Sequence, residues 1–504
     1  MKITSSFLVL ALAGLTIAEE LEERTLPFPL LPFVSSTVYQ ALVSEKKLLN
    51  HAKEFVKFSK LSNGTRVFGS EGHQASIRYI KKLLDDTKYY DTEFQTFNYL
   101  YSQGTAAFQA NGTNYDTAWF TYGPGGTVVA PIVPVNDLGC TPGDYPAAVA
   151  GKIALIKRGT CEFGLKIALA GSAGAAGALL YNNAPGSIGG GTLGAPSRPE
   201  GPYVAAGSLT GADGEALRAT ILAGSEVIGT LKVDAVNEDR TTSNVIATTK
   251  RGNKDSIVVV GGHTDSVVAG PGINDDGSGT IGILELALKL PLFNVKNAVR
   301  FGFWTAEEFG LVGSEHYVTN LPQEERDKIA LYLNFDMIAS PNAGYFIYDG
   351  DGSAFGLTGP PGSAHIEKTF EDFFAKKKTI SAPTEFSGRS DYGPFLDVGI
   401  PAGGLFTGAE GVMTEDEAKW WKGKAGVAYD VCYHKDCDGI DNLNLPVWVL
   451  NTKAAAHSIA TYANSLKGIP FPRVAPETAS AVRIASLPYE ERRHSACGHE
   501  VAKV

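Results

Sequence analysis

Side chains that bind metal ions follow several short apolar runs in the second half of the chain. His263 ends the run VVVGGH, Glu308 follows NAVRFGFW, and Asp336 closes LYLNFD. Asp275 lies in GINDDGSG, and His434 lies between two cysteines in CYHKDC. Imidazole and carboxylate groups are common zinc ligands. Five of them exceed what a single catalytic zinc needs, so the set predicts two metal ions about 3.5–4 Å apart that share a bridging carboxylate.

Further acidic residues lie beside these ligands. Two adjacent glutamates that leave a strand, Glu307 and Glu308, cannot both point the same way, so one can bind metal while the other moves a proton. Asp265 follows His263 by two residues and is placed to orient its ring. Each pattern also has a simpler interpretation, because His-x-Asp occurs in surface loops and adjacent carboxylates often cap helices. Their recurrence at successive strand ends favours a metal site.

The elements that must position these residues alternate between strands and helices. Buried-strand patterns are followed by helical periodicity, with strands predicted at 256–262, 297–304, 330–337 and 403–406 and helices at 278–290, from about 310, and at 366–374. This alternation predicts a doubly wound, mostly parallel α/β sheet, which binds its ligands at the carboxyl ends of the strands.

The first half of the chain has a different pattern of apolar residues, glycines and prolines. Helices are predicted at 53–60 and 74–84 and a strand at 94–101. From about residue 123 to 233, short Val/Ile runs are broken by Gly and Pro, and an Ala/Gly-rich stretch predicts a helix over 165–183. This change in sequence pattern predicts a separate domain.

Composition and the N-terminus restrict the class of protein. The chain has 504 residues, 44% hydrophobic and 19% charged, which is typical of a globular protein with more than one domain. Its net charge of −10 argues against a nucleic-acid partner. The apolar run 7–17 before Ala18 predicts a signal peptide, and the lack of a later long apolar run argues against a membrane partner. We therefore expect a secreted or vacuolar protein, with glycosylation sequons at Asn63 and Asn111.

The motifs resemble, in order, those of the M28 family of zinc aminopeptidases, and the similarity is greatest to the secreted bacterial and fungal leucine aminopeptidases. It extends from about 241 to 466 and rests on GGHTDSV, GINDDGSG, WTAEEFGLVGSEHY, NFDMI, GRSDYGPF and YH. The stretch from about 123 to 233 resembles the protease-associated (PA) domain that is inserted in this branch of the family. The resemblance implies the zinc exopeptidase fold with an inserted β-rich α/β PA domain.

The resemblance also implies how two zinc ions are held. His263 and Asp336 would bind one ion, Glu308 and His434 would bind the other, and Asp275 would bridge them. The two ions would activate a water molecule for attack on a peptide bond.

Other residues take catalytic and substrate-binding roles by the same resemblance. Glu307 would be the general base and acid, Asp265 would orient an imidazole ligand, and the phenol of Tyr433 would assist the oxyanion. The free α-amine of the substrate would meet carboxylates of the site and the backbone near Arg389. Phe406 would line an apolar pocket for the first side chain, although it could also be ordinary core.

The five cysteines allow two disulfides. Cys432 and Cys437 flank His434 and could bind zinc, but in an oxidising compartment a disulfide is favoured. Cys140 and Cys161 both lie in the insert and predict a second disulfide. Cys497 is left over in the tail.

These predictions divide the chain into a signal peptide (1–18), a leader or propeptide (19–43), the first part of the peptidase domain (44–122), the PA insert (123–235), the catalytic domain (236–467) and a tail (468–504). The predicted function is a zinc-dependent, monomeric aminopeptidase that acts on peptides with a free N-terminus and prefers apolar, Leu-like residues. Three alternatives stay open: a carboxypeptidase, a glutaminyl-cyclase-like acyltransferase and a non-catalytic receptor. The complete ligand set and the presence of Glu307 disfavour them.

Overall fold

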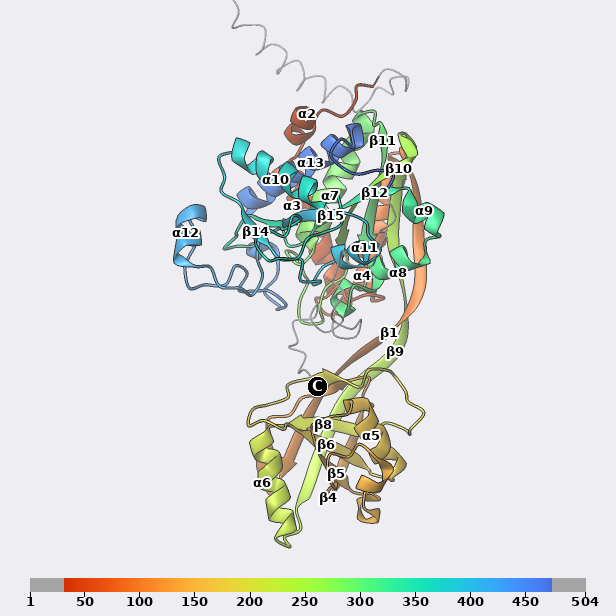
Figure 1. Ribbon diagram of the computed structural model, residues 1–504, viewed down its shortest axis with the longest axis vertical. Coiled ribbons are helices and arrows are strands. Elements are labelled where there is room, and N and C mark those ends of the chain that lie inside the picture. The colour runs from red at the N-terminus through yellow and green to blue at the C-terminus, as the bar shows by residue number, and fades with distance from the viewer. Residues whose placement is uncertain (1–30, 474–504) are drawn as a thin grey trace, which may run out of the picture.

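The computed structural model describes residues 31–473. The predicted signal peptide and Cys497 lie outside the described residues. Figure 1 shows two lobes, one above the other, joined by two long strands, β1 and β9. No helix among residues 31–473 is long and apolar enough to cross a membrane.

The upper lobe is built on a mostly parallel sheet. Its strands are β10 (Asn253–His263), β11 (Asn297–Trp304), β12 (Ile329–Phe335) and β15 (Ala402–Phe406), with β13 (Phe346–Tyr348) and β14 (Ala382–Thr384) at one edge. β10 pairs in parallel with β11 and with β12, and β12 pairs in parallel with β15. The four longer strands are almost entirely buried, which explains their continuous apolar runs. The predicted fold class is confirmed.

Helices cover both faces of this sheet (Figure 1). The larger core lies under α2 (Ser36–Ala41), α3 (Glu45–Ser59), α4 (Glu71–Asp86), α7 (Gly277–Lys289), α10 (Ser363–Lys376) and α13 (Leu445–Asn464). A second core lies under α8 (Val312–Asn320) and α11 (Tyr392–Asp397). Two short helices, α9 (Gln323–Asp327) and α12 (Glu415–Trp421), complete the lobe.

The strands that join the lobes are longer than the sequence pattern predicts. β1 (Tyr90–Ala110) pairs antiparallel with β9 (Ile228–Thr249) along its whole length, from Tyr90 opposite Thr249 to Ala110 opposite Gly229. Only 94–101 was predicted as a strand, because the rest of the ribbon lacks a continuous apolar pattern. β9 pairs with β11 in the upper lobe and with β4 in the lower lobe, so one strand belongs to both sheets.

The lower lobe contains a parallel sheet of β4 (Gly126–Pro134), β5 (Ile153–Lys157), β6 (Gly177–Tyr181) and β8 (Ala205–Leu209). In Figure 1, α5 (Phe163–Ser172) and α6 (Gly211–Leu222) lie on opposite sides of it. Three short strands, β2 (Thr113–Tyr115), β3 (Phe120–Thr121) and β7 (Gly191–Thr192), lie at its margins. The expected disulfide between Cys140 and Cys161 is present in this lobe.

Two predictions differ from the structure. The helix expected over 165–183 is wrong in its second half: α5 ends at Ser172, Gly174 has the left-handed φ of 77°, and the apolar residues that follow form the buried strand β6. The leader was expected to reach residue 43, but α2 packs into the core. Tyr39 is buried there, and its hydroxyl donates to the carbonyl of Leu286 at 2.7 Å.

Candidate active site

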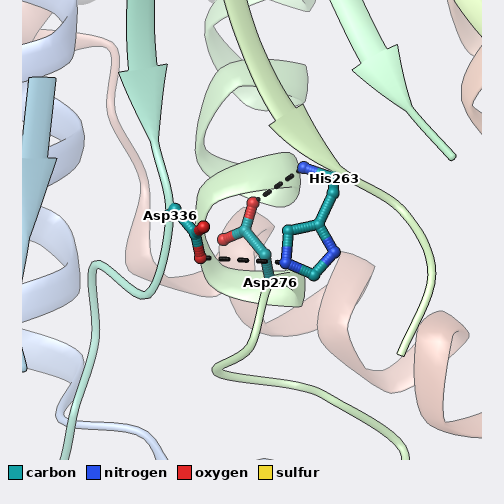
Figure 2. Close-up of side chains that lie close together, drawn as sticks. All are labelled: His263, Asp276 and Asp336. Carbon is teal, nitrogen blue, oxygen red and sulfur yellow. Dashed lines mark hydrogen bonds and ion pairs between the residues drawn. The ribbon is translucent and has the colours of Figure 1, made fainter. Parts of the chain in front are cut away.

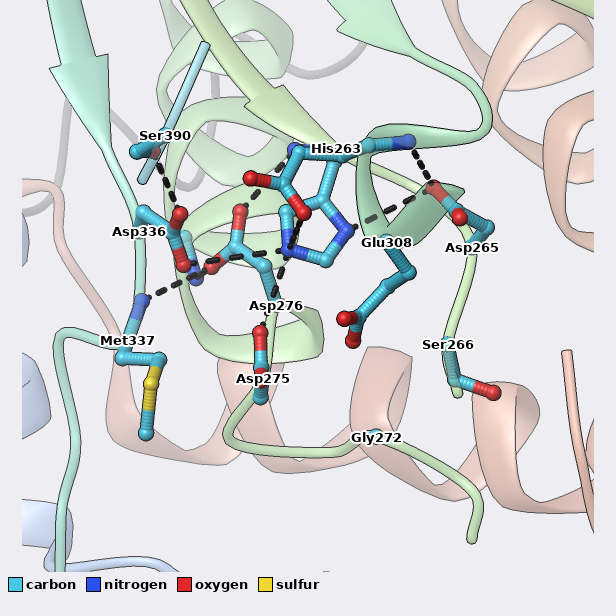
Figure 3. A network of polar contacts seen from close by, with 12 residues as sticks. His263, Asp265, Ser266, Gly272, Asp275, Asp276, Glu308, Asp336, Met337 and Ser390 are labelled. Atoms are coloured by element: carbon cyan, nitrogen blue, oxygen red, sulfur yellow. Dashed lines mark hydrogen bonds and ion pairs between the residues drawn. The ribbon is translucent and has the colours of Figure 1, made fainter. Parts of the chain in front are cut away.

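The five predicted metal ligands come together at the carboxyl end of the parallel strands. His263 is the last residue of β10, Asp336 follows β12, and Glu308 lies in the 3₁₀ turn Glu307–Phe309 after β11. Asp275 lies just before α7, and His434 lies in the segment between α12 and α13. Figure 3 shows the side chains of His263, Asp275, Glu308 and Asp336 converging on one region.

The carboxylate of Asp275 lies between the two imidazoles. Its Oδ1 is 3.1 Å from Nε2 of His263, and its Oδ2 is 3.1 Å from Nε2 of His434. His434 Nε2 is also 3.0 Å from a carboxylate oxygen of Glu308, and His263 Nε2 is 3.8 Å from one of Asp336. Ligand atoms that surround one zinc ion tetrahedrally at about 2.0–2.1 Å lie roughly 3.3 Å from one another. The donor types and their spacing therefore fit two zinc ions with Asp275 between them.

The electrostatics of these side chains favour the binding of cations. Burial raises the pKa of Glu308 to about 7 and that of Asp336 to about 6. Burial alone would lower the pKa of His434, but the carboxylates of Glu308 and Asp275 raise it to about 10. Buried carboxylates this close together repel one another unless cations compensate them. Two divalent cations would provide that compensation.

Glu307 lies at the Nε2 side of the His263 ring, as Asp275 and Asp336 do, and Asp265 lies at the Nδ1 side. A carboxylate oxygen of Glu307 is 3.9 Å from His263 Nε2, and burial raises the pKa of Glu307 well above its ordinary value. Asp265 Oδ1 is 3.5 Å from His263 Nδ1 and accepts the backbone N–H of Glu307 at 3.1 Å. Asp265 thus contacts the ring of a candidate metal ligand and the backbone of the candidate base, and the second contact was not predicted.

Asp276 is a site residue that the motifs did not single out. Its carboxylate accepts backbone N–H groups of His263 at 3.0 Å, Gly279 at 2.8 Å and Met337 at 3.1 Å. Figure 2 shows it between His263 and Asp336. These three donors occupy both oxygens, so Asp276 ties two strand ends to the start of α7 and is a weaker candidate ligand than Asp275. The simpler interpretation of adjacent carboxylates, a helix cap, holds for Asp276, which is the N-cap of α7.

Arg66 is a second residue that sequence reasoning missed. It is fully buried, and its guanidinium donates to the carbonyls of Thr264, Pro271 and Gly272 in the loop between His263 and Asp275. Burial lowers its pKa to about 10, although the nearby carboxylates favour the charged form. It lies about 200 residues before this loop, and no local pattern connects the two.

A pocket beside the metal ligands contains the predicted substrate-binding residues. Phe406, Arg389 and Tyr433 line it together with Glu307 and Asp336. Arg389 donates to the hydroxyl of Tyr433 at 3.0 Å and to the carboxylate of Glu410 at 2.7 Å. The ring of Tyr433 stacks on that of His434, with 3.8 Å between ring centroids. A hydroxyl and an apolar side chain therefore face the same space as the candidate base.

Cys432 and Cys437 form a disulfide across the loop that carries His434. This bond takes up both sulfur atoms and leaves imidazole and carboxylate donors for the metals. The disulfide closes a loop of only a few residues, so it restricts where His434 can lie.

We predict that replacing both Cys432 and Cys437 with Ser will weaken zinc binding about tenfold, because a less restricted His434 loses more freedom on binding. Competition with a chromophoric chelator measures this affinity. The Cys140→Ser/Cys161→Ser variant, which removes the disulfide of the lower lobe, serves as the control and should bind zinc as the wild type does. Equal zinc affinity in both double variants would contradict the prediction.

Both predicted glycosylation sequons lie at turns. Asn63 and Asn111 are exposed and have left-handed φ angles of 53° and 50°. Their exposure is compatible with modification, which stays a prediction.

Comparisons with known proteins agree with this geometry. Residues 244–459 match the family model described as peptidase family M28, and residues 126–217 match that of the PA domain. The probable leucine aminopeptidase 2 of Aspergillus fumigatus is 50% identical over 440 residues, which cover 87% of each chain. Leucine aminopeptidase 2 of Trichophyton rubrum is 44% identical over 498 residues, which cover 98% of this chain and 99% of its own.

The chain is also similar in structure to aminopeptidases whose structures have been solved. An aminopeptidase from Aneurinibacillus sp. strain AM-1 superimposes with a TM-score of 0.64 at 28% identity, covering 85% of this chain and 96% of its own. BSAP, a zinc aminopeptidase from Bacillus subtilis, superimposes with a TM-score of 0.56 at 26% identity, covering 82% and 94%. The similarity thus includes both lobes.

Proposed function

The chain belongs to peptidase family M28, and on that premise we propose that it is an aminopeptidase that removes N-terminal residues with apolar, Leu-like side chains from peptides at a site for two zinc ions. The observation that carries the proposal is the position of Asp275, whose two oxygens each lie 3.1 Å from a different imidazole. A carboxylate shared in this way is the arrangement expected of a two-metal centre.

The ions would be held by His263 and Asp336 on one side of Asp275 and by Glu308 and His434 on the other. When bound, zinc lowers the pKa of a water molecule and stabilises negative charge on the scissile carbonyl. Glu307 contacts the same cluster but is not needed as a ligand, so its carboxylate is available to take a proton from the attacking water.

Glu307 would return that proton to the leaving amine, since a group that acts as base in the first step can act as acid in the second. Tyr433, held by Arg389 at 3.0 Å, would donate a hydrogen bond to the developing oxyanion. Asp265 would fix the ring of His263 and the backbone of the base.

The pocket would bind the substrate by its amino end. The carboxylates of Glu307 and Asp336 line the pocket with Phe406, so a positively charged α-amine and an apolar first side chain would both find complementary surroundings. A carboxypeptidase needs a free cation for the substrate carboxylate, whereas Arg389 is paired with Glu410 at 2.7 Å. This pairing supports an enzyme that acts at the amino end.

We further propose that the protein enters the secretory route, acts outside the cell or in a vacuole, and is monomeric. The apolar run at 7–17 and the two disulfides support the location, since disulfides persist in oxidising compartments.

The test compares leucine p-nitroanilide with its N-acetylated form and with C-terminally blocked peptides. We expect kcat/KM for the free amine to exceed that for the N-acetylated form by at least about 10³-fold, because acetylation removes the charge that the carboxylates bind and adds bulk. Amidation of the peptide C-terminus should have little effect. Equal cleavage of both anilides, or dependence on a free C-terminus, would refute the proposal.

A further inference from the structure

The two glutamates that follow β11 lie in an unfavourable backbone turn. Ala306, directly before Glu307, has φ of 54°, and Leu311 has φ of 58°; both carry a Cβ in the left-handed region. A turn of this kind persists only where its surroundings hold it in place.

Asn244, on β9, holds the two ends of this turn. Its Oδ1 accepts the backbone N–H of Thr305 at 3.0 Å, and its Nδ2 donates to the carbonyl of Gly313 at 2.8 Å. Thr305 and Gly313 flank the segment that carries Glu307 and Glu308. Asn244 is fully buried, so both bonds form away from water.

The two ends also lie unusually close to each other at this point. A Cβ atom on Gly313 would lie 2.2 Å from the carbonyl oxygen of Thr305 and 2.5 Å from Oδ1 of Asn244. Only glycine allows this approach. The carboxamide of Asn244 thus lies where Thr305 and Gly313, the two ends of the turn, approach each other; we call this place the neck of the turn.

Thr242, two residues earlier on the same face of β9, makes a second connection. Its hydroxyl lies 2.5 Å from the hydroxyl of Thr305, and it too is fully buried. Asn244 Nδ2 also donates to Gln95 on β1 at 2.9 Å. The ribbon of β1 and β9 is therefore bonded to the neck of the turn by two of its strand residues.

We propose that Asn244 is a positioning residue for the reaction, assisted by Thr242: it holds the turn so that Glu307 faces the attacking water and Glu308 faces its metal ion. This inference rests on the proposed function for the role of Glu307. Asn244 contacts neither substrate nor metal ligand side chain, and it acts through the backbone at Thr305 and Gly313.

A loosened turn should affect the rate of the reaction more than the binding of substrate. Asp336 and Phe406 follow or end other strands, and Arg389 and Tyr433 lie in other loops, so of the pocket residues that would bind substrate only Glu307 moves with a loosened turn. Substrate binding should therefore change much less than the position of the base. A misplacement of the base by about 1 Å can reduce the rate on the order of 100-fold. Loss of the Asn244 hydrogen bonds should therefore lower kcat by a much larger factor than it raises KM.

The test uses two replacements at each position. Asn244→Leu keeps the volume and removes the hydrogen bonds, and Asn244→Ala also removes the volume; we expect kcat on leucine p-nitroanilide to fall about 30- to 100-fold in both, with KM within about twofold. Thr242→Val should lower kcat about threefold to tenfold, and Thr242→Ser, which retains the hydroxyl, should restore it. Thr241→Val is the matched control, because Thr241 is the exposed neighbour whose hydroxyl donates to Asn98 instead. It should behave as the wild type.

Zinc affinity gives a readout that does not depend on turnover. Because Glu308 lies in the same turn, Asn244→Leu should bind zinc about tenfold more weakly than the wild type, and Thr241→Val should not. Wild-type kcat and wild-type zinc affinity in Asn244→Leu, even with a lowered Tm, would overturn the inference and leave Asn244 with a role in folding alone. If the wild type cleaved no free-amine substrate, the proposed function would fail. The zinc affinities would still test whether Asn244 positions the turn that carries Glu308.

Discussion

Glu307→Gln is expected to lower kcat by about 10²- to 10⁴-fold in protein that retains its full zinc content, which is the range for loss of a general base. The amide keeps the size and shape of the carboxylate but cannot accept a proton from water. Glu307 lies 3.9 Å from Nε2 of His263, whereas the three carboxylates predicted as ligands, those of Asp275, Glu308 and Asp336, lie 3.0–3.8 Å from Nε2 of His263 or His434. Its loss should therefore leave the metals in place.

The neighbouring residue supplies the control. Glu308→Gln removes a carboxylate that lies 3.0 Å from His434 Nε2, so this variant should lose zinc as well as activity. Zinc content is measured on the purified proteins by atomic absorption, and kcat on leucine p-nitroanilide with zinc in excess. A Glu307→Gln enzyme with kcat within tenfold of the wild type would show that another group is the base. A Glu307→Gln protein without zinc would make Glu307 a ligand.

The residues that could be predicted from the sequence share one property: each follows a recognisable element at a short distance. His263 ends an apolar strand and Asp336 follows one, so the rule for parallel sheets brings them together without any knowledge of side-chain packing. Phe406, at the end of β15, was assigned through the resemblance to the M28 family and lies at the same edge of the sheet.

The residues that could not be predicted act across long separations in the chain. Arg66 bonds to carbonyls about 200 residues later, and Asn244 holds a turn about 60 residues later. Neither contact has a spacing that a local pattern can reveal. The second half of the helix expected at 165–183 failed for a related reason, since pairing of β6 with β5 and β8 outweighs the helical preference of its alanines and leucines.

Removal of zinc should abolish activity and lower Tm, and the size of the Tm change should depend on pH. In the metal-free protein the pKa of Glu308 is raised to about 7 and that of Asp336 to about 6. Between their ordinary values and these raised values the folded protein holds protons that the unfolded chain has released, so stability falls as pH rises. The pKa of His434 is raised to about 10, and the stability that its proton provides is likewise lost as pH rises from its ordinary value toward 10.

All three groups therefore act in the same direction between pH 5.5 and 8. Zinc replaces the protons on its ligands, so the loaded protein does not lose this stability and binds the metal more tightly as pH rises. We expect the Tm gap between zinc-loaded and chelator-treated protein to be wider at pH 8 than at pH 5.5 by about 5 °C or more. Differential scanning fluorimetry of both forms at the two pH values measures it.

The Glu308→Gln variant separates this cause from a general effect of pH. Its metal-free form lacks the carboxyl whose pKa is raised to about 7, so its Tm should fall less between pH 5.5 and 8 than that of the metal-free wild type. Restoring zinc to chelator-treated wild type should return both activity and Tm, which excludes irreversible damage by the chelator. A Tm gap that stayed constant or narrowed toward pH 8 would mean that protons do not substitute for the metal ions on these ligands. In that case the buried carboxylates would have to be stabilised in the metal-free state by contacts other than those of His263 and His434.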